Sequence, residues 1–497
     1  MKPEVWSHTW RALAVLLCAL ALSLPALAAR DTIRLGVQLE PPMLDPTATA
    51  AATAGEITYA NVLEGLTVID AKGRVAPRLA TGWERAPDGL SYTFTLRRGV
   101  RFHDGKAFDA SVAVASLRRI VAADSRNPQK KWFEKIAGVQ AVGSHQLVIG
   151  LHQPDALLPF ALALPAAVMV HPDTAAGNAT RPIGTGPFQF GQWQRGHSVQ
   201  IERHAGYWGK KPALRSATFV FLNSSAETEN MLAEGRLDWL GSVTKMSDPF
   251  MARPDYRMGS RKLESKMILA INNARPPFND VRVRRALAHA IDRFDLSTIY
   301  GTQFKPQLIG SHFAPWHPAY VDLAQRYPFD PARARALLAE AGVEPGTRVA
   351  LTVPPTDYGR FGGLKIADKL EEVGFRVDLV QVDWKRWMSE VFEKKDYELT
   401  LILHVEPLDL NIYARPGYYF NYDSSAFRAL WERVLSASTE AELNARLGDA
   451  QRQISEDAVN VFLFMRPERN FMHKDLMGVW EESPIPSFVL EDVDWRR

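Results

Sequence analysis

Alternating and helical patterns of apolar residues predict a run of strands and helices between residues 348 and 405. Three segments are short and rich in apolar residues, and two repeat apolar residues at helical spacing. The predicted strands are 348–353, 376–382 and 397–405, and the predicted helices are 363–373 and 384–393. This β-α-β-α-β order requires parallel strands joined by right-handed crossovers. The run therefore predicts an α/β fold.

Two further helices are predicted from their start signals. Asp280 is a good N-cap, and the apolar positions after it fall on one helical face. The basic side chains that lie mostly off this face are interpreted as a solvated surface: Arg282, Arg284 and Arg285. Asp330, followed by a proline, starts the second helix, because proline fits the first helical turn.

The N-terminal half contains strand, helix and turn signals. Residues 91–96 and 146–151 alternate as half-buried strands do, and residues 111–121 are predicted to be helical. Residues 184–188 read Gly-Thr-Gly-Pro-Phe, which superficially resembles a phosphate loop. Proline removes a backbone donor and no lysine follows, so we predict a turn there.

The first 28 residues are predicted to be a cleavable signal peptide. Lys2 and Arg11 precede an apolar run over residues 12–24. Ala26-Leu27-Ala28, which follows the run, has the small-x-small pattern of a cleavage site. The run is shorter than the ~20 residues that span a membrane. Cys18, the single cysteine, lies inside this leader, so the predicted mature chain has no disulfide.

Composition and motifs exclude several classes of protein. The 497 residues are 46% apolar and 23% charged, with a net charge of +3, which gives no reason to expect nucleic acid as a partner. The chain has no H-E-x-x-H motif, no G-x-S-x-G elbow and no G-x-G-x-x-G loop after a strand. Scattered histidines such as His312 and His317 are interpreted as surface or core residues. We therefore expect a protein that is not an enzyme and that carries no cofactor.

The loops after the three parallel strands form the predicted ligand site, because open parallel sheets bind ligands beyond the carboxyl ends of their strands. They mix aromatic rings with a few charges, as small-molecule pockets do. Their side chains include Thr356, Asp357, Tyr358, Arg360, Asp383, Trp384, Trp387, His404, Glu406, Asp409 and Asn411, followed by Tyr418, Tyr419 and Phe420. Carboxylates suit a ligand ammonium group, and aromatic faces attract a cation. Trp384 and Trp387 fit the protein core as well as a pocket wall, and Asp357 also fits a turn.

Short motifs follow one another in a specific order along almost the whole predicted mature chain. They are Leu44-Asp45-Pro46, Leu63-Glu64-Gly65-Leu66, Ala76-Pro77-Arg78-Leu79-Ala80 with Trp83, Asp88-Gly89, Phe94-Thr95-Leu96-Arg97, Val100-Arg101-Phe102-His103-Asp104-Gly105, Gly184 to Phe188, Tyr207-Trp208, Val283 to Arg293 and Ala336 to Gly342. Each motif is weak alone, whereas the whole series is specific. Through it the chain resembles the family 5 extracellular solute-binding proteins, the peptide and nickel class of ABC importers.

The resemblance implies a two-lobed periplasmic binding protein fold, of the type II, large peptide-binding class, with an additional subdomain. The implied parts are lobe I at 29–262 and 466–497, a subdomain within it at about 49–181, and lobe II at 263–465. The chain is expected to cross into lobe II near residues 261–272 and to return near residues 462–471. The β-α-β-α-β run then lies in lobe II.

The resemblance also implies a function. A monomeric periplasmic protein would capture an oligopeptide or related amine-bearing molecule between its lobes and deliver it to the permease subunits of an ABC importer. Two alternatives stay open. The ligand could be a non-peptide solute such as a metal chelate, a sugar or an opine-like compound, or the protein could serve a membrane sensor without transport.

Individual residues acquire roles from the same resemblance. In dipeptide-binding relatives an acidic residue after the last strand holds the ligand amine, and Glu406 is the nearest match here, with Asp409 second. Arg360, beside Tyr358, is the candidate for binding the ligand carboxylate. His404 stands where relatives have tryptophan, and a histidine of nickel-binding relatives helps to hold a metal chelate. The complete predicted ligand-binding set is Glu406, Asp409, His404, Tyr358, Arg360, Trp384, Tyr418, Tyr419, Met43 and Tyr59, and no catalytic or metal residue is predicted.

Overall fold

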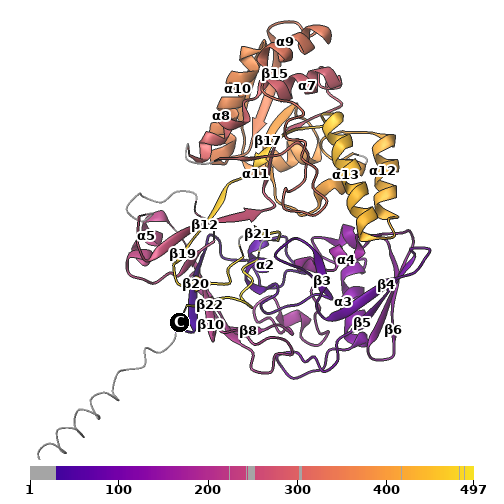
Figure 1. The fold of residues 1–497 in the computed structure, drawn as a ribbon, viewed down its shortest axis with the longest axis vertical. Coiled ribbons are helices and arrows are strands. Elements are labelled where there is room, and N and C mark those ends of the chain that lie inside the picture. The colour runs from indigo at the N-terminus through magenta and orange to yellow at the C-terminus, as the bar shows by residue number, and fades with distance from the viewer. Residues whose placement is uncertain are drawn as a thin grey trace, which may run out of the picture.

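The structure, a computed structural model, describes residues 30–222, 224–241, 243, 252–301, 305–415, 417–480, 482–485 and 487–496. The predicted signal peptide and Cys18 lie outside these residues. Figure 1 shows two lobes stacked along the long axis of the molecule, with the indigo N-terminal segments in the lower lobe and the orange segments in the upper lobe. The lower lobe is called lobe I and the upper lobe II.

Lobe I is built on a mixed sheet of eight described strands. In sheet order these are β21 (Glu482–Ser483), β12 (Tyr256–Leu263), β19 (Glu468–His473), β11 (Trp239–Leu240), β1 (Thr32–Val37), β10 (Ser216–Phe221), β9 (Ser198–Arg203) and β8 (Phe188–Gln194). β1 runs parallel to both of its neighbours. Lobe I also contains helices α2 (Ala52–Thr58) and α5 (Ser225–Ala233). The C-terminal segment closes its core, where Phe488 meets Phe219 and Trp239 edge to face.

A smaller antiparallel sheet lies beside lobe I, at the lower right of Figure 1. Its strands in sheet order are β4 (Ala80–Arg85), β5 (Ser91–Leu96), β7 (Gln146–Leu151) and β6 (Ile136–Val142). Helix α3 (Ala110–Val121) packs against β6 and β7, and its N-cap Asp109 accepts hydrogen bonds from two backbone N–H groups. The strands predicted at 91–96 and 146–151 and the helix predicted at 111–121 are therefore confirmed. The remaining short elements here are β2 (Thr67–Ile69), β3 (Val75–Pro77) and α4 (Leu158–Ala161).

One buried carboxylate joins the segment before β4, the first strand of this small sheet, to lobe I. Glu64 is 1% exposed, and its Oε1 accepts hydrogen bonds from Arg78 Nε at 2.6 Å and Tyr207 OH at 3.0 Å. Its Oε2 accepts from Thr185 Oγ1 at 2.8 Å and Trp208 Nε1 at 3.0 Å. Four segments that are distant in sequence therefore meet at one charged group. The motifs around these five residues have a structural role, because they build a single buried network.

The predicted turn at residues 184–188 is confirmed as a bend that leads into β8. Its glycines let two backbones approach closely, since a Cβ at Gly184 would lie 1.9 Å from the carbonyl oxygen of Val62. His103 closes the other side of the bend. Its Nδ1 accepts from the N–H of Gly184 at 3.2 Å, and its Nε2–H donates to the carbonyl oxygen of Gly186 at 3.1 Å.

Stability is expected to fall in acid partly because of His103. Burial lowers its pKa from 6.5 to about 4, and the ring of His204, centred 4.9 Å away, acts in the same direction. A histidine whose folded-state pKa is lowered stabilises the fold fully above its unfolded-state pKa, and this contribution is lost as the pH falls toward the folded-state value. Urea unfolding at pH 7 and pH 5 should therefore show that the free energy of unfolding falls less between these pH values in His103→Gln than in the parent. His197 is exposed, so His197→Gln should keep the pH dependence of the parent. An equal change in unfolding free energy in all three proteins would contradict the stabilising role of neutral His103.

Lobe II is built on a sheet of six described strands. In sheet order these are β14 (Gln307–Leu308), β18 (Val461–Met465), β13 (Lys266–Ile271), β17 (Leu399–His404), β15 (Thr347–Val353) and β16 (Phe375–Gln381). β15 pairs in parallel with both β16 and β17, so the predicted parallel β-α-β-α-β unit is confirmed. All six residues of β13 are buried, because its side chains alternate between two hydrophobic cores.

Helices cover both faces of the lobe II sheet. One core contains apolar residues of α7 (Val281–Ala290), α8 (Arg293–Ser297), α9 (Pro331–Glu340) and α10 (Gly363–Glu372), and the other contains those of α12 (Ser425–Leu435) and α13 (Glu440–Glu456). Asp280 and Asp330 cap α7 and α9 as predicted. The predicted helix at 384–393 is also confirmed, although α11 (Trp384–Arg386) continues as a wider π-helix over Trp387–Glu393.

The interpretation of Arg284 as a solvated residue was wrong. Its side chain is 8% exposed, and its guanidinium donates to the carbonyl oxygens of Phe278, Asp457 and Ala458. Arg284 therefore joins the start of α7 to the end of α13. A long basic side chain can bury its stem and still satisfy its charged end with carbonyl oxygens, which a position on a helical wheel does not reveal.

Two short links connect the lobes. Glu264 and Ser265 join β12 of lobe I to β13 of lobe II, and Arg466 and Pro467 join β18 back to β19. The two links are themselves hydrogen-bonded, from the N–H of Arg466 to the carbonyl oxygen of Ser265 at 2.8 Å. A separate contact lies at the yellow helix pair in Figure 1, where the N–H of Ala156 donates to the carbonyl oxygen of Leu435 at the end of α12.

Candidate functional site

The end of β17 brings together several of the predicted site residues. His404, the last residue of this strand, is 7% exposed. Its Nδ1 lies 2.9 Å from Asp409 Oδ2, and its Nε2 lies 2.9 Å from the hydroxyl of Tyr419. Asp409 and Tyr419 are also buried, so these three predicted ligand-binding residues satisfy one another inside lobe II. Burial raises the pKa of Asp409, and the hydrogen bond from His404 opposes this effect.

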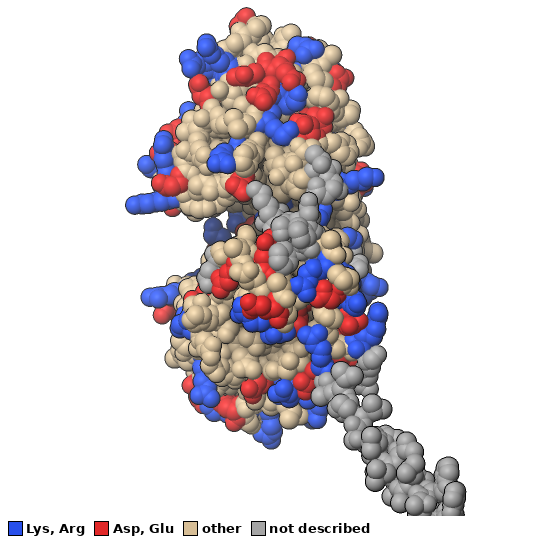
Figure 2. Space-filling view, turned by 90° about the vertical axis from the view of Figure 1, so that its left-hand side faces the viewer, with Lys and Arg blue, Asp and Glu red and all other residues tan. Residues whose placement is uncertain are grey.

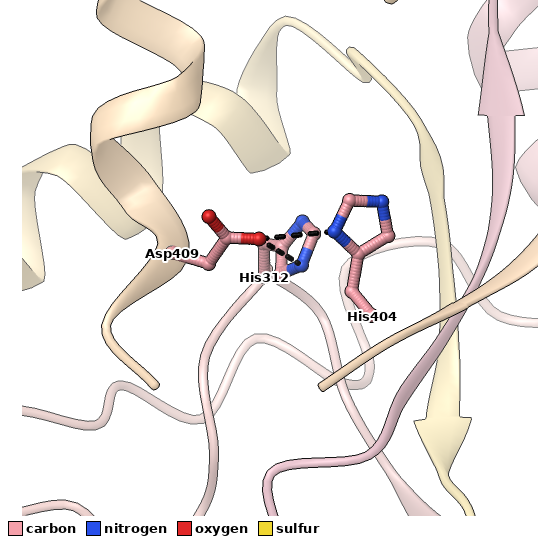
Figure 3. Close-up of side chains that lie close together, drawn as sticks. All are labelled: His312, His404 and Asp409. Atoms are coloured by element: carbon pink, nitrogen blue, oxygen red, sulfur yellow. Dashed lines mark hydrogen bonds and ion pairs between the residues drawn. The ribbon is translucent and has the colours of Figure 1, made fainter. Parts of the chain in front are cut away.

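A second histidine completes this cluster, and the sequence did not single it out for a site. His312 is fully buried, and its ring centroid lies 4.7 Å from that of His404 (Figure 3). Its Nδ1 lies 2.6 Å from the hydroxyl of Tyr413, and its Nε2 lies 3.7 Å from Asp409 Oδ2. Burial lowers the pKa of His312 well below its usual value, and the neighbouring His404 and Lys266 act in the same direction. The ring is therefore neutral near pH 7.

Glu406 differs from Asp409 because its carboxylate faces solvent. Its side chain is 61% exposed, whereas its main-chain oxygen accepts a hydrogen bond from Lys266 Nζ at 2.7 Å. Lys266 is the first residue of β13 and is fully buried. Its ammonium also contacts Glu264 Oε2 at 2.9 Å, in the link between the lobes. The backbone of the Glu406 loop is thus tied to the crossover from lobe I.

The aromatic candidates fall into buried and exposed groups. Trp387 is 4% exposed and donates from Nε1 to Thr400 Oγ1, so it belongs to the core of lobe II. Trp384 is 45% exposed and meets the Trp387 ring edge to face. Tyr418 is half-buried, and its ring contacts those of Tyr419 and Phe392. Trp384 and Tyr418 can therefore offer ring surface to a ligand, whereas Trp387 packs against Trp384 and Tyr419 in the core of lobe II.

The other predicted residues lie elsewhere. Tyr358 begins a π-helical turn after β15 and is half-buried, and Arg360 in the same turn is exposed with its guanidinium over the ring of Phe361. Met43 and Tyr59 belong to lobe I. Met43 is half-buried, and Tyr59 is fully buried with its hydroxyl donating to the carbonyl oxygen of Ala163. The part of these four residues in ligand binding stays a prediction.

A hollow separates the lobes in Figure 2, and a cavity of about 760 Å³ lies at the links between them. Its lining comes from β12, from the end of β18, from the link formed by Arg466 and Pro467, from β19 and from the segment around β14. The charged lining residues are Arg261, Lys262, Lys305, Arg466, Glu468 and Arg469. Basic side chains outnumber the single acidic one, so the cavity favours groups of negative charge.

Comparison with known families decides the class of the chain. The model of the bacterial extracellular solute-binding proteins, family 5 (middle), matches residues 74–417. The chain belongs to this family. The family 5 protein is 30% identical over 500 residues to the glutathione-binding protein GsiB of Salmonella choleraesuis, with 98% of this chain and 93% of that protein covered. It is 29% identical over 347 residues to di/tripeptide-binding protein 2 of Pseudomonas aeruginosa, with 62% and 64% covered.

Solved structures confirm the fold of the family 5 protein. The ABC transporter substrate-binding protein CtaP of Listeria monocytogenes matches it with a TM-score of 0.83 at 19% identity, over 94% of this chain and all of that one. The expected two-lobed periplasmic binding protein fold is therefore confirmed. No helix in the described part of the family 5 protein is both long and apolar enough to cross a membrane.

Proposed function

We propose that this family 5 protein captures a peptide or a related amine-bearing small molecule between its lobes and delivers it to the membrane permease of an ABC importer. Ligand contacts from both lobes stabilise the closed state, and the permease recognises that state. The protein itself makes and breaks no bond. It acts as a monomer in the periplasm after export by the signal peptide at residues 1–28, and ligand capture requires neither an organic cofactor nor nucleic acid.

Glu406 is the observation that carries this proposal. Of the two carboxylates that follow β17, Asp409 is buried against His404, whereas the carboxylate of Glu406 is 61% exposed. An exposed carboxylate on an anchored backbone can accept charge-assisted hydrogen bonds from a ligand ammonium group. The exposed ring of Trp384 and the half-buried ring of Tyr418 lie in the neighbouring loop and segment, and such rings add apolar and cation–π contacts.

The charge of the cavity at the lobe links supports the same ligand class. A peptide carries a carboxylate as well as an amine, and the charged residues that line this cavity are mainly lysines and arginines. Arginine and lysine bind carboxylates through charge-assisted hydrogen bonds. The names of the relatives, which refer to glutathione and to di- and tripeptides, agree with a ligand that combines both groups.

The ligand can be identified by mass spectrometry. Protein purified from its source is denatured, and the released small molecules are analysed and then tested one by one by calorimetry together with a panel of peptides. We expect an amine-bearing ligand that binds with one-to-one stoichiometry. The proposal fails if the released ligand has no amine and no peptide produces heat.

Glu406→Ala is expected to weaken binding of that ligand by about 2–5 kcal/mol, because the substitution leaves a buried ammonium group without its partner in the closed state. Calorimetry measures this change. Glu344 is a matched control, since it is an exposed carboxylate in the turn before β15, at the opposite end of that strand. Glu344→Ala should bind as the parent does, and an unchanged affinity in Glu406→Ala would remove the amine-binding role from Glu406.

A further inference from the structure

We propose that His312, His404 and Asp409 form a closed binding site for a divalent transition-metal ion inside lobe II. One candidate ligand atom from each residue lies within 4.8 Å of the other two. Asp409 Oδ2 is 2.9 Å from His404 Nδ1 and 3.7 Å from His312 Nε2. Ligand atoms around a tetrahedral zinc ion, with bonds of about 2.1 Å, lie about 3.4 Å apart. Only small movements separate the observed cluster from that arrangement.

The outer hydrogen bonds hold both imidazole rings in the orientation that metal binding needs. The ring nitrogens that face away from Asp409 contact tyrosine hydroxyls, His404 Nε2 at Tyr419 and His312 Nδ1 at Tyr413. Asn460 Nδ2 donates to the Tyr413 hydroxyl at 3.0 Å, which fixes the position of this hydroxyl beside His312 Nδ1. Metal-binding histidines usually use their second nitrogen in such a hydrogen bond, which fixes the tautomer and the direction of the lone pair. Here both remaining nitrogens point toward Asp409 (Figure 3).

His312 Nε2 provides an independent indication. It belongs to a fully buried side chain, and it has no hydrogen-bond partner among the described residues. Its distance of 3.7 Å from Asp409 Oδ2 is too long for a hydrogen bond. Buried polar atoms in native proteins nearly always have a partner, so an unpartnered nitrogen aimed at a carboxylate calls for an explanation. A metal ion between these atoms would satisfy it.

The donor set and the charges select the class of ion. Two imidazoles and one carboxylate suit zinc, nickel, cobalt or copper better than calcium or magnesium, which prefer oxygen ligands. Asp409 supplies one negative charge. The nearby ammonium of Lys266 is balanced by Glu264 at 2.9 Å, so its repulsion of a cation is reduced. Both histidines are shielded from solvent, which distinguishes this site from a ligand cleft open to a chelator.

The proposed ion would join two distant parts of lobe II. His312 lies in the segment after β14. His404 and Asp409 lie at the two ends of the loop that carries Glu406. A bound ion would therefore pin this loop to the segment after β14. The metal proposal does not depend on the nature of the transported ligand, because its three ligands are His312, His404 and Asp409, and the Glu406 carboxylate, 3.9 Å from His404 Nδ1, is not one of them.

The test uses the full-length protein, stripped of metal with a chelator and then mixed separately with zinc, nickel and cobalt salts. Elemental analysis after gel filtration should find about one ion per chain, and the melting temperature should rise with ion concentration, as it does for any ligand that binds the folded state. Cobalt should also give the visible absorption of a low-coordinate site with nitrogen and oxygen ligands. Substoichiometric binding of all three ions, with no shift in melting temperature, would overturn the proposal.

Variants separate this cluster from other histidines. His312→Gln and Asp409→Asn should each weaken zinc binding by more than about 100-fold, a larger loss than changes in outer hydrogen-bond partners cause. His197→Gln removes an exposed histidine of lobe I and should leave zinc binding unchanged. Equal zinc binding in folded His312→Gln and in the parent would also overturn the proposal. If His312→Gln fails to fold, the cobalt spectrum of the parent decides the question, because surface-bound cobalt keeps the pale spectrum of its hydrated form.

Discussion

Replacing Glu64 with alanine is expected to destabilise the protein by about 3–5 kcal/mol, because the change leaves a largely buried arginine, 14% exposed, without its main charged partner. Arg78 contacts Glu64 Oε1 at 2.6 Å, and the side chain of Glu64 is completely shielded from solvent. The hydroxyls of Thr185 and Tyr207 and the indole N–H of Trp208 would lose their acceptor at the same time. Urea and thermal unfolding measure the loss.

Glu84→Ala provides the matched control for this prediction. Glu84 is an exposed glutamate of β4, in the neighbouring small sheet, and its replacement should change stability by less than about 0.5 kcal/mol. Arg78 keeps a second contact with Glu491 at 2.8 Å, which should prevent complete unfolding of the Glu64 variant. A loss below about 1 kcal/mol in Glu64→Ala would mean that water replaces the carboxylate, and the network would then not join the small sheet to lobe I.

Lys266→Met is the second substitution with a large expected effect, again about 3–5 kcal/mol of unfolding free energy. The ammonium of Lys266 contacts Glu264 and the main-chain oxygen of Glu406, and the whole side chain is buried. Methionine fills a similar volume but leaves the Glu264 carboxylate unpaired. Unfolding in urea measures the cost.

A double variant separates the ion pair from the backbone anchor. Glu264→Leu combined with Lys266→Met removes both charges and should recover most of the lost stability, since an apolar pair often replaces a buried ion pair without loss. Ligand affinity should be lower than in the parent in both Lys266→Met and the double variant, because the main-chain oxygen of Glu406 lacks its donor in each. Recovery of full affinity would show that this anchor does not position Glu406.

The sequence predicted the local architecture of lobe II well because periodicity and capping are local properties. The strands at 347–353, 375–381 and 399–404, and the caps Asp280 and Asp330, follow from residue types within a few positions of one another. Parallel pairing followed from element order alone. The wider π-helix after α11 could not be predicted, since helical periodicity does not distinguish the two windings over a single turn.

The candidate site was harder to predict, because its key contacts join distant segments. Glu406 and Asp409 are three positions apart and chemically similar, yet one is exposed and the other is enclosed by His404. Only the packing of lobe II separates these two roles. His312 carried no signal of its own, since it lies in an irregular segment about 90 residues before His404 and becomes informative only beside it. The role of Glu64 was hidden for the same reason.

The two links between the lobes have a mechanical consequence. Each is two residues long, and a hydrogen bond joins them, so lobe II can rotate about this pair but has little freedom to slide. Points near a rotation axis travel a shorter path than points far from it. The backbone of Glu406 is tied through Lys266 to the first of these links and therefore lies near the axis. During closure its carboxylate should hold an almost constant position relative to lobe I, while parts of lobe II that lie farther from the axis travel farther. A ligand anchored there would first be tethered by its amine and only afterwards enclosed.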